Sequence, residues 1–126
     1  MIPIRLLCVD DSDDVGRAIC RAARYEQGIE AVGSLTHCEG LADAIERLRP
    51  DVVLLDLSMP GEAPLEHIPR IAAKSPQTRV ILFSGYDDEA TRQRAREAGA
   101  SGFISKDAEL TDVFGAVRAA AAGDAT

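Results

Sequence analysis

A chain of 126 residues has the size of a single domain, and its 46% hydrophobic and 28% charged residues are typical of a globular protein. A formal net charge of −7 with only 4% aromatic residues argues against direct nucleic-acid binding, because Lys and Arg hold phosphates and aromatic rings stack on bases. No apolar run approaches the roughly 20 residues that cross a bilayer, and no signal segment opens the chain, so we expect a cytoplasmic protein without membrane contact.

The chain begins with a predicted strand–helix–strand unit. Ile4–Val9 is a short apolar strand. The acids that follow it, with Ser12 or Asp13 as the N-cap, begin a helix that extends to about Tyr25. Ile29–Leu35 is a less regular strand, as expected at the outside of a sheet.

A helix and a buried strand follow. Thr36 and Glu39 are spaced as a capping box, in which both side chains satisfy free amides at the start of a helix. Pro50 ends this helix, whose buried stripe is expected to comprise Leu41, Ala44, Ile45 and Leu48. Val52–Leu55 is an unbroken apolar run, typical of a parallel strand covered on both faces. It leads directly into Asp56, which is therefore predicted at the edge where open α/β sheets bind ligands.

The second half continues the alternation. A helix is expected from Leu65 to Lys74, kinked or delayed by Pro69, with the inward-facing residues Leu65, Ile68, Ile71 and Ala72. Arg79–Phe83 is another unbroken apolar strand. The helix Asp87–Ala98 carries charges nearly all round, and its apolar contacts are limited to Ala90, Ala95 and Ala98. Such a helix gains little from packing, so we expect it to move.

Phe103–Ser105 is the last predicted strand. The helix from Glu109 to about Ala122 has its apolar stripe at Leu110, Val113, Phe114 and Val117. Gly123–Thr126 is expected to be a disordered tail, which leaves residues 1–122 as one domain. Five strands alternating with five helices predict an α/β fold. We expect a doubly wound five-stranded parallel sheet of order 2-1-3-4-5, the flavodoxin-like (βα)5 arrangement.

The cysteines and histidines carry no predicted chemistry. Cys8, Cys20 and Cys38 fall in predicted strands or helices and form no C-x-x-C pair. We therefore expect buried free thiols in a reducing compartment, not a disulfide framework or a zinc site. His37 and His67 lack ligand partners at metal spacing and are expected at surface or cap positions.

Polar residues occupy the predicted carboxyl ends of four strands. They are Asp10 and Asp11 after the first strand, Asp56 at the third, Ser84 at the fourth and Lys106 at the fifth. Each alone has an ordinary explanation as a helix cap, a turn residue or a solvated charge. In the order 2-1-3-4-5, however, the first and fourth strands flank the third, so these side chains are expected to meet at one edge.

Such a carboxylate cluster is predicted to bind a divalent cation. Two like charges about 5 Å apart repel by roughly 3 kcal/mol at an effective dielectric of 20. An all-oxygen acidic site prefers Mg²⁺, with Mn²⁺ as an alternative. We expect Asp11 and Asp56 as direct ligands, and Asp10 through a water molecule. The chemistry suggested is phosphoryl transfer to a carboxylate, with charge offset by Mg²⁺ and Lys106.

This ordered set resembles the receiver domain of two-component response regulators over essentially the whole chain. By that resemblance, Asp56 accepts a phosphoryl group from a sensor histidine kinase or a histidine phosphotransfer protein, in a domain that is not a turnover enzyme. The metal ligands would be Asp10, Asp11, Asp56 and the backbone carbonyl of Ser58.

The resemblance also implies a conformational switch. Ser84 would hydrogen-bond the phosphoryl oxygens and Lys106 would pair with them, while Phe103 holds the position of the family's switch aromatic. Phosphorylation would then change the partners of the face formed by residues 87–98, 103–105 and 109–122. The resemblance leaves open which downstream protein binds this face and whether phosphorylation causes two copies of the chain to dimerise. It also leaves open whether the chain is a stand-alone protein or part of a larger regulator.

Some positions depart from the family pattern. Asp107 replaces the Pro that usually follows the lysine, which leaves open whether the Lys106–Asp107 peptide bond is cis or trans. The segment Lys106–Ala108 resembles that of receivers attached to LuxR-type regulators. Glu62–Pro64 replaces a usual small or Gly-containing segment, which leaves the shape of that loop open. Ser58 and Tyr86 stand where the family tunes the phosphoryl lifetime.

Two other classes of protein share features with this chain. A haloacid-dehalogenase-type phosphatase also uses an aspartate nucleophile at a strand end, but its second aspartate would fall at Ser58. A flavin- or nucleotide-binding module needs a Gly- or Ser/Thr-rich loop after the first strand, where this chain has acids.

Overall fold

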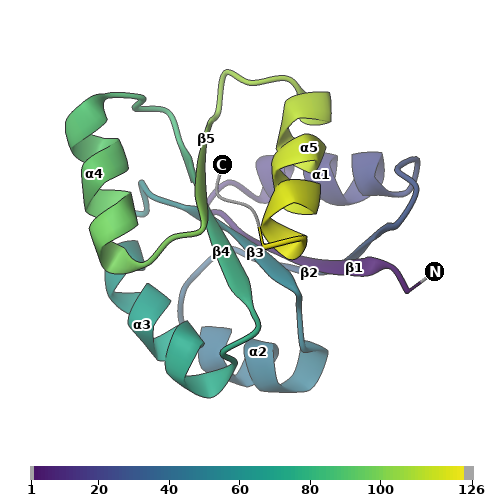
Figure 1. The fold of residues 1–126 in the computed structure, drawn as a ribbon, viewed down its shortest axis with the longest axis horizontal. Coiled ribbons are helices and arrows are strands. Elements are labelled where there is room, and N and C mark those ends of the chain that lie inside the picture. The colour runs from purple at the N-terminus through teal and green to yellow at the C-terminus, as the bar shows by residue number, and fades with distance from the viewer. Residues whose placement is uncertain (1, 124–126) are drawn as a thin grey trace.

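A central parallel sheet organises residues 2–123, the part of the chain that the computed structural model describes (Figure 1). Within this part, five strands run in the predicted order β2-β1-β3-β4-β5. They are β1 (Ile4–Val9), β2 (Ile29–Leu35), β3 (Val52–Asp56), β4 (Arg79–Ser84) and β5 (Gly102–Ser105). The helices are α1 (Asp13–Ala23), α2 (Leu41–Leu48), α3 (Pro64–Lys74), α4 (Glu89–Ala98) and α5 (Leu110–Ala121). Residues 124–126 of the predicted tail lie outside the described range.

Helices cover both faces of the sheet, which confirms the doubly wound fold (Figure 1). On one face, Ile19 of α1 and Phe114 of α5 pack around Leu54. On the other face, α2, α3 and α4 enclose a second cluster that includes Ile45 and Leu55. All residues of β3 are buried, as its unbroken apolar run predicts, whereas the outer strand β2 is mostly half-buried or exposed. Asp56 therefore ends a strand that is protected on both faces.

The start of α2 differs from the prediction. The helix begins at Leu41, and Gly40 before it has a φ of 79°, a left-handed conformation that suits glycine. Thr36 and Glu39 thus do not form a capping box. Instead, a carboxylate oxygen of Glu62, from the loop after β3, accepts the Cys38 N–H at 2.6 Å. This amide is satisfied by a residue that is distant in sequence, which no local capping rule can find.

Other helices differ from the prediction in detail. The helix α3 starts at Pro64 and continues through Pro69, so that proline does not delay it. Ala72 of α3 is exposed, not inward-facing. Leu110 is 44% exposed, because it lies in the first turn of α5 and the helix makes its core contacts from Val113 onward. At α1, the Ser12 hydroxyl accepts the Val15 N–H at 3.4 Å, which confirms Ser12 as the N-cap.

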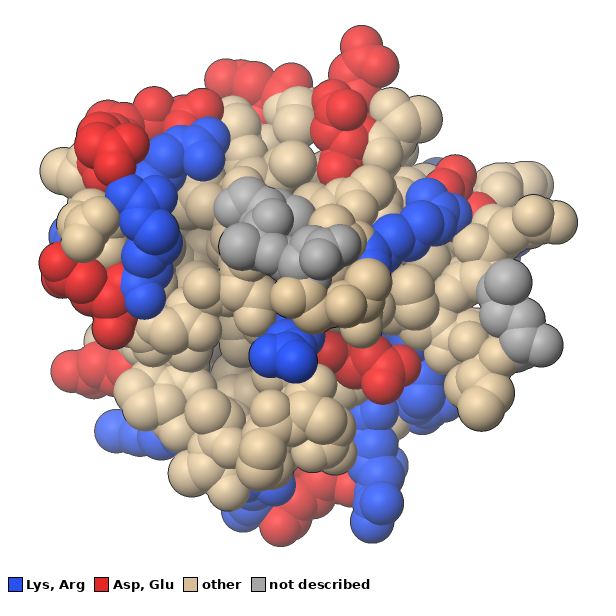
Figure 2. All heavy atoms as spheres, in the orientation of Figure 1, with Lys and Arg blue, Asp and Glu red and all other residues tan. Residues whose placement is uncertain are grey.

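The helix α4 is sparsely packed, as its sequence predicts. Ala95 is its one buried residue, and charged side chains of both signs crowd the surface over it, at the left of Figure 2. Ion pairs such as that between Arg96 and Glu89 run along its exposed side. Exposed pairs of this kind contribute little to stability. None of the described helices is both long and apolar enough to cross a membrane.

Replacing glycine by alanine is expected to have opposite effects on stability at two positions. Gly99 ends α4 with a φ of 99°, so Gly99→Ala should destabilise the fold by about 1 kcal/mol. Gly115 lies inside α5, where an added Cβ meets nothing within 4 Å, so Gly115→Ala should stabilise it by about 0.5–1 kcal/mol. Urea denaturation of both variants measures these changes. If the two variants change in stability equally, or if Gly115→Ala is the less stable one, the backbone conformations given for Gly99 and Gly115 are wrong.

Candidate functional site

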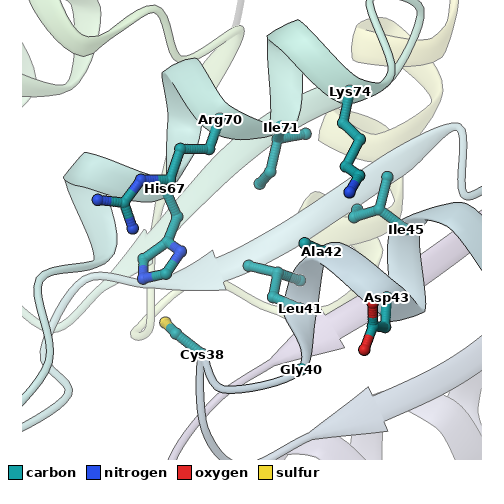
Figure 3. A pocket seen from close by; sticks show the side chains of 10 residues that line it. All are labelled: Cys38, Gly40, Leu41, Ala42, Asp43, Ile45, His67, Arg70, Ile71 and Lys74. Atoms are coloured by element: carbon teal, nitrogen blue, oxygen red, sulfur yellow. The ribbon is translucent and has the colours of Figure 1, made fainter.

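One surface hollow lies away from the predicted site. It has a volume of about 370 Å³, and Figure 3 shows its walls on α2 and α3. His67 is half-buried in one wall, next to Arg70, whereas His37 is exposed. Lys74, in the same wall, pairs with Glu46 at 3.3 Å. None of the residues predicted to take part in phosphoryl transfer lines this hollow.

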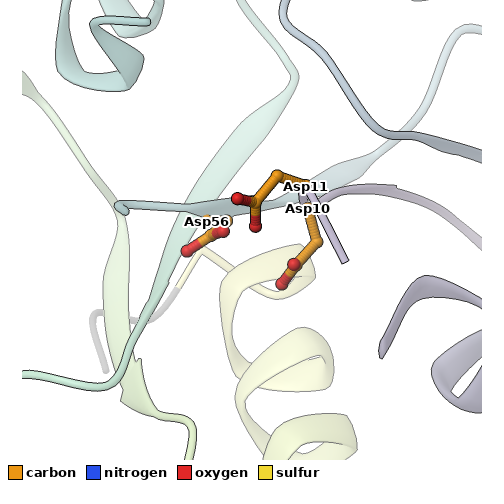
Figure 4. Close-up of side chains that lie close together, drawn as sticks. All are labelled: Asp10, Asp11 and Asp56. Carbon is orange, nitrogen blue, oxygen red and sulfur yellow. The ribbon is translucent and has the colours of Figure 1, made fainter. Parts of the chain in front are cut away.

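The predicted carboxylates do meet at the carboxyl edge of the sheet (Figure 4). Asp10 and Asp11 follow β1, and Asp56 ends the neighbouring strand β3. One ligand oxygen of each carboxylate lies within 4.8 Å of the others. Asp10 and Asp56 are 3% and 0% exposed, whereas Asp11 is open to solvent. The cluster therefore has a buried floor and an accessible rim.

Backbone amides hold the two buried carboxylates in place. The Ser12 N–H donates to Asp10 Oδ1 at 2.9 Å, and the Ser58 N–H donates to Asp56 Oδ1 at 3.0 Å. Asp56 Oδ2 is buried without a hydrogen-bond partner. An unpartnered buried carboxylate oxygen is costly and calls for an explanation, such as a bound ion or a reactive role.

Lys106 is the cation of this cluster. Its Nζ lies 3.0 Å from Asp10 Oδ2 and 3.2 Å from Asp56 Oδ1, and it sits over the Phe83 ring at 5.5 Å from the centroid. The contact with Asp10 Oδ2 is an ion pair without a well-aligned hydrogen bond. The Lys106 N–H donates to the Ser84 carbonyl at 2.8 Å, which anchors the lysine backbone to the end of β4. Its peptide bond with Asp107 is trans.

Burial and charge shift the protonation of this cluster. Burial raises the pKa of Asp56 to about 6, and the Asp10 charge adds to the rise, although the Ser58 amide and Lys106 oppose it. Burial alone would lower the pKa of Lys106, but its contacts with Asp10 and Asp56 raise it overall. Asp56 is therefore mostly ionised at neutral pH, at a cost in folding free energy.

The donor set suits a hard divalent cation. Three carboxylates face one lysine, so the cluster keeps an excess of negative charge. Carboxylate oxygens are the ligands that Mg²⁺ and Mn²⁺ prefer. The unpartnered Asp56 Oδ2 and the exposed carboxylate of Asp11 are available to such an ion.

The other two predicted residues, Ser84 and Phe103, differ in their surroundings. Ser84 is fully buried at the end of β4, and its hydroxyl accepts the Tyr86 N–H at 3.0 Å. Phe103 is 7% exposed and belongs to the core under α4. The guanidinium of Arg92 lies over its ring at 4.8 Å from the centroid, and Arg92 Nε donates to Asp87 Oδ1 at 2.6 Å. The sequence offered no signal for Arg92, because charges surround α4 almost completely.

A second hollow has a volume of about 500 Å³. It lies between the loop that follows β3 and the start of α4, and Ser58, Tyr86 and Arg94 are among its lining residues. This hollow reaches Ser58, two residues after Asp56, but none of Asp10, Asp11, Asp56 and Lys106 lines it.

Comparisons with known proteins agree with this geometry. A family model described as the response regulator receiver domain matches residues 6–118. Response regulator GacA of Pseudomonas aeruginosa is 32% identical over 120 residues, which cover 95% of this chain and 56% of that protein. Nitrate/nitrite response regulator protein NarL of Escherichia coli K12 is 33% identical over 122 residues, with 97% and 56% covered. The chain thus spans about half the length of these curated relatives.

A solved structure shares the whole fold. The crystal structure of a LuxR-family two-component response regulator from Aurantimonas sp. SI85-9A1 matches with a TM-score of 0.89 at 26% identity. The match covers 98% of this chain and 88% of that one.

Proposed function

Because this chain belongs to the response regulator receiver domain family, we propose that Asp56 is the phosphoacceptor of a two-component signalling switch. A receiver domain implies a histidine kinase partner, and such domains are generally not turnover enzymes. The observation that carries the proposal is the buried Asp56 Oδ2, which has no hydrogen-bond partner beside a lysine and two further carboxylates.

The proposed reaction is phosphoryl transfer from a phosphorylated histidine of the kinase, or of a phosphotransfer protein, to Asp56. An Asp56 oxygen forms a bond to phosphorus as the phosphorus–nitrogen bond to the donor histidine breaks. Lys106, whose Nζ lies 3.2 Å from Asp56 Oδ1, offsets negative charge on the transferred group. The Ser58 amide keeps the acceptor carboxylate oriented.

The residues that would hold Mg²⁺ are Asp10, Asp11, Asp56 and the backbone carbonyl of Ser58. When bound, the ion neutralises charge on the phosphoryl oxygens. Asp10 and Asp56 are fixed by backbone amides, so the site is largely formed before an ion binds. Asp11 is exposed and completes the site from the solvent side.

The proposed output is a change in the face formed by α4, β5 and α5. Ser84 would exchange its bond from Tyr86 N–H for the phosphoryl oxygens, which pulls on the loop that leads to Asp87. Asp87 pairs with Arg92, and Arg92 covers Phe103, so this movement would reach the switch aromatic directly. Phe103 is already buried, so the expected change is in the contact between its ring and Arg92 of α4.

The remaining parts of the proposal concern the cellular setting. We place the chain in the cytoplasm, where free thiols such as Cys8, Cys20 and Cys38 persist. The face that changes would bind a downstream protein or a second copy of the chain. The chain's net charge of −7 makes direct binding to nucleic acid by this domain unfavourable.

Asp11→Asn tests the metal site with little risk to the fold. Asp11 is exposed, so its replacement should leave stability almost unchanged and weaken Mg²⁺ binding by at least about tenfold, since one of three carboxylates is lost. Isothermal titration calorimetry measures the affinity, with Asp14→Asn as the control because Asp14 is an exposed acid on α1. Equal Mg²⁺ affinities of the two variants would mean that Asp11 is not a metal ligand.

A further inference from the structure

Two cysteines outside the phosphorylation site face the same stretch of β2. Cys8 lies on β1, and its Cα is paired in register with that of Ser34. Cys20 lies on α1, and its Sγ is 4.0 Å from the carbonyl oxygen of Gly33, the neighbour of Ser34. The Cys8 side chain belongs to the core cluster that includes Ile19, the neighbour of Cys20 on α1. Two elements that are separated by a loop thus bring the two cysteines to the same part of the fold.

Cys20 is accessible, which corrects the expectation that all three thiols are buried. It is half-buried and lines a hollow of about 260 Å³ with Arg24 and Glu30. The neighbouring Cys8 thiol lowers the pKa of Cys20 to about 7, with help from the Arg24 charge and against the effect of burial. A thiolate in an open hollow beside a cation is the form of cysteine that reacts with oxidants.

We propose that Cys20 is a peroxide-reactive cysteine and that Cys8 is its resolving partner. The Cys20 thiolate attacks one oxygen of hydrogen peroxide, the oxygen–oxygen bond breaks, and Cys20 sulfenic acid and hydroxide form. The Cys8 sulfur then attacks the sulfenic sulfur. A disulfide forms and the hydroxyl leaves as water with the Cys8 proton. Sulfur loses two electrons in total, and the peroxide is reduced.

The position of this pair links it to the acidic cluster. A Cys8–Cys20 disulfide closes a loop that contains Asp10, Asp11 and the N-cap residue Ser12. Oxidation would therefore tie the two ends of the segment that supplies two of the carboxylates. The oxidation itself does not depend on phosphorylation of Asp56, so it can be tested separately from the proposed function.

Cys38 provides an internal control in the same chain. It is 5% exposed, and its Sγ lies 4.0 Å from the Met59 sulfur. Burial raises the pKa of Cys38 to about 11, with the Glu62 and Asp56 charges adding to the rise. At neutral pH it is a protonated, enclosed thiol and should react far more slowly than Cys20.

The test is oxidation of the full chain with a small excess of hydrogen peroxide at pH 7.5, followed by alkylation in denaturant and mass spectrometry without reductant. We expect the intact chain to lose two hydrogen atoms and to retain one alkylated cysteine. Trypsin should then release a linked pair of peptides, Leu6–Arg17 joined to Ala18–Arg21, and the alkyl group should lie on Cys38. A Cys20–Cys20 link between chains, or oxidation of Cys38 as fast as Cys20, would overturn the proposal.

Two variants separate the roles of the cysteines. Cys20→Ser should abolish the rapid reaction, and Cys8→Ser should leave Cys20 as a sulfenic acid that dimedone traps. Because Cys8 is buried in the core, Cys8→Ala is a second choice if the serine variant does not fold. Trapping of sulfenic acid on Cys8 in the Cys20→Ser variant, at the rate seen for the natural chain, would contradict the assigned roles.

Discussion

Asp56→Asn is expected to reduce Mg²⁺-dependent labelling by a small phosphodonor such as acetyl phosphate by at least about 100-fold. The asparagine amide is neutral and a poor nucleophile, and it cannot form the acyl phosphate that a carboxylate forms. The substitution keeps the shape of the side chain, so the effect reports chemistry and not a cavity. Intact mass spectrometry after incubation with donor and Mg²⁺ gives the labelled fraction.

Asp112→Asn is the matched control for this experiment. Asp112 is an exposed acid in the first turn of α5 and is not one of the clustered carboxylates. Its replacement should leave labelling unchanged. Undiminished labelling of Asp56→Asn would mean that another residue accepts the phosphoryl group.

The same Asp56→Asn substitution is expected to stabilise the metal-free fold at pH 7.5. The pKa of Asp56 rises from its ordinary value of 3.8 to about 6, so the fold favours the protonated carboxyl. The contribution of Asp56 to stability is therefore most favourable below about pH 4, declines between pH 4 and pH 6, and is constant above pH 6. This rise in the Asp56 pKa corresponds to a loss of about 3 kcal/mol in the free energy of unfolding at neutral pH. Asparagine does not ionise, so the variant avoids this cost.

Urea denaturation with a chelator present, between pH 4.5 and pH 8, measures the difference between variant and natural chain. The gain of the variant should be largest above pH 6 and should shrink as the pH falls. Mg²⁺ should stabilise the natural chain more than the variant, because it offsets the same repulsion. A variant that is less stable at pH 7.5, or a gain that does not change with pH, would contradict the raised pKa of Asp56.

The fold could be predicted from the sequence because its strands are unambiguous. The unbroken apolar runs of β3 and β4 require cover on both faces, and helices on both sides of a parallel sheet provide it. Once the strand order follows, the carboxyl ends of β1, β3 and β5 bring Asp10, Asp56 and Lys106 to one edge. The distances between these side chains follow from the register of the sheet, not from any local pattern.

Other features depend on contacts that no local pattern contains. The free amide at Cys38 is met by Glu62 from another loop, so the apparent capping box of Thr36 and Glu39 is not used. Leu110 fits the helical spacing of α5 but lies outside its core contacts. The stacking of Arg92 on Phe103 joins two elements whose relative position only the folded chain defines.

The cysteines show the same limit of sequence patterns. Spacing alone gave no reason to pair Cys8 with Cys20, because the pairing rules concern short motifs. The two residues lie near the same part of β2 because α1 packs against β2 and β1. The accessible hollow beside Arg24 forms where residues around α1 and β2 pack together, so it could not be predicted from the spacing of the cysteines.

The most direct test of the central claim is a crystal structure of the chain grown with Mn²⁺ and beryllofluoride, a mimic of the phosphoryl group. We predict an anomalous Mn²⁺ peak in contact with the carboxylates of Asp11 and Asp56, and beryllium bonded to an Asp56 oxygen with Lys106 beside its fluorines. A Mn²⁺ peak away from these carboxylates, or beryllofluoride on a different aspartate, would contradict the account.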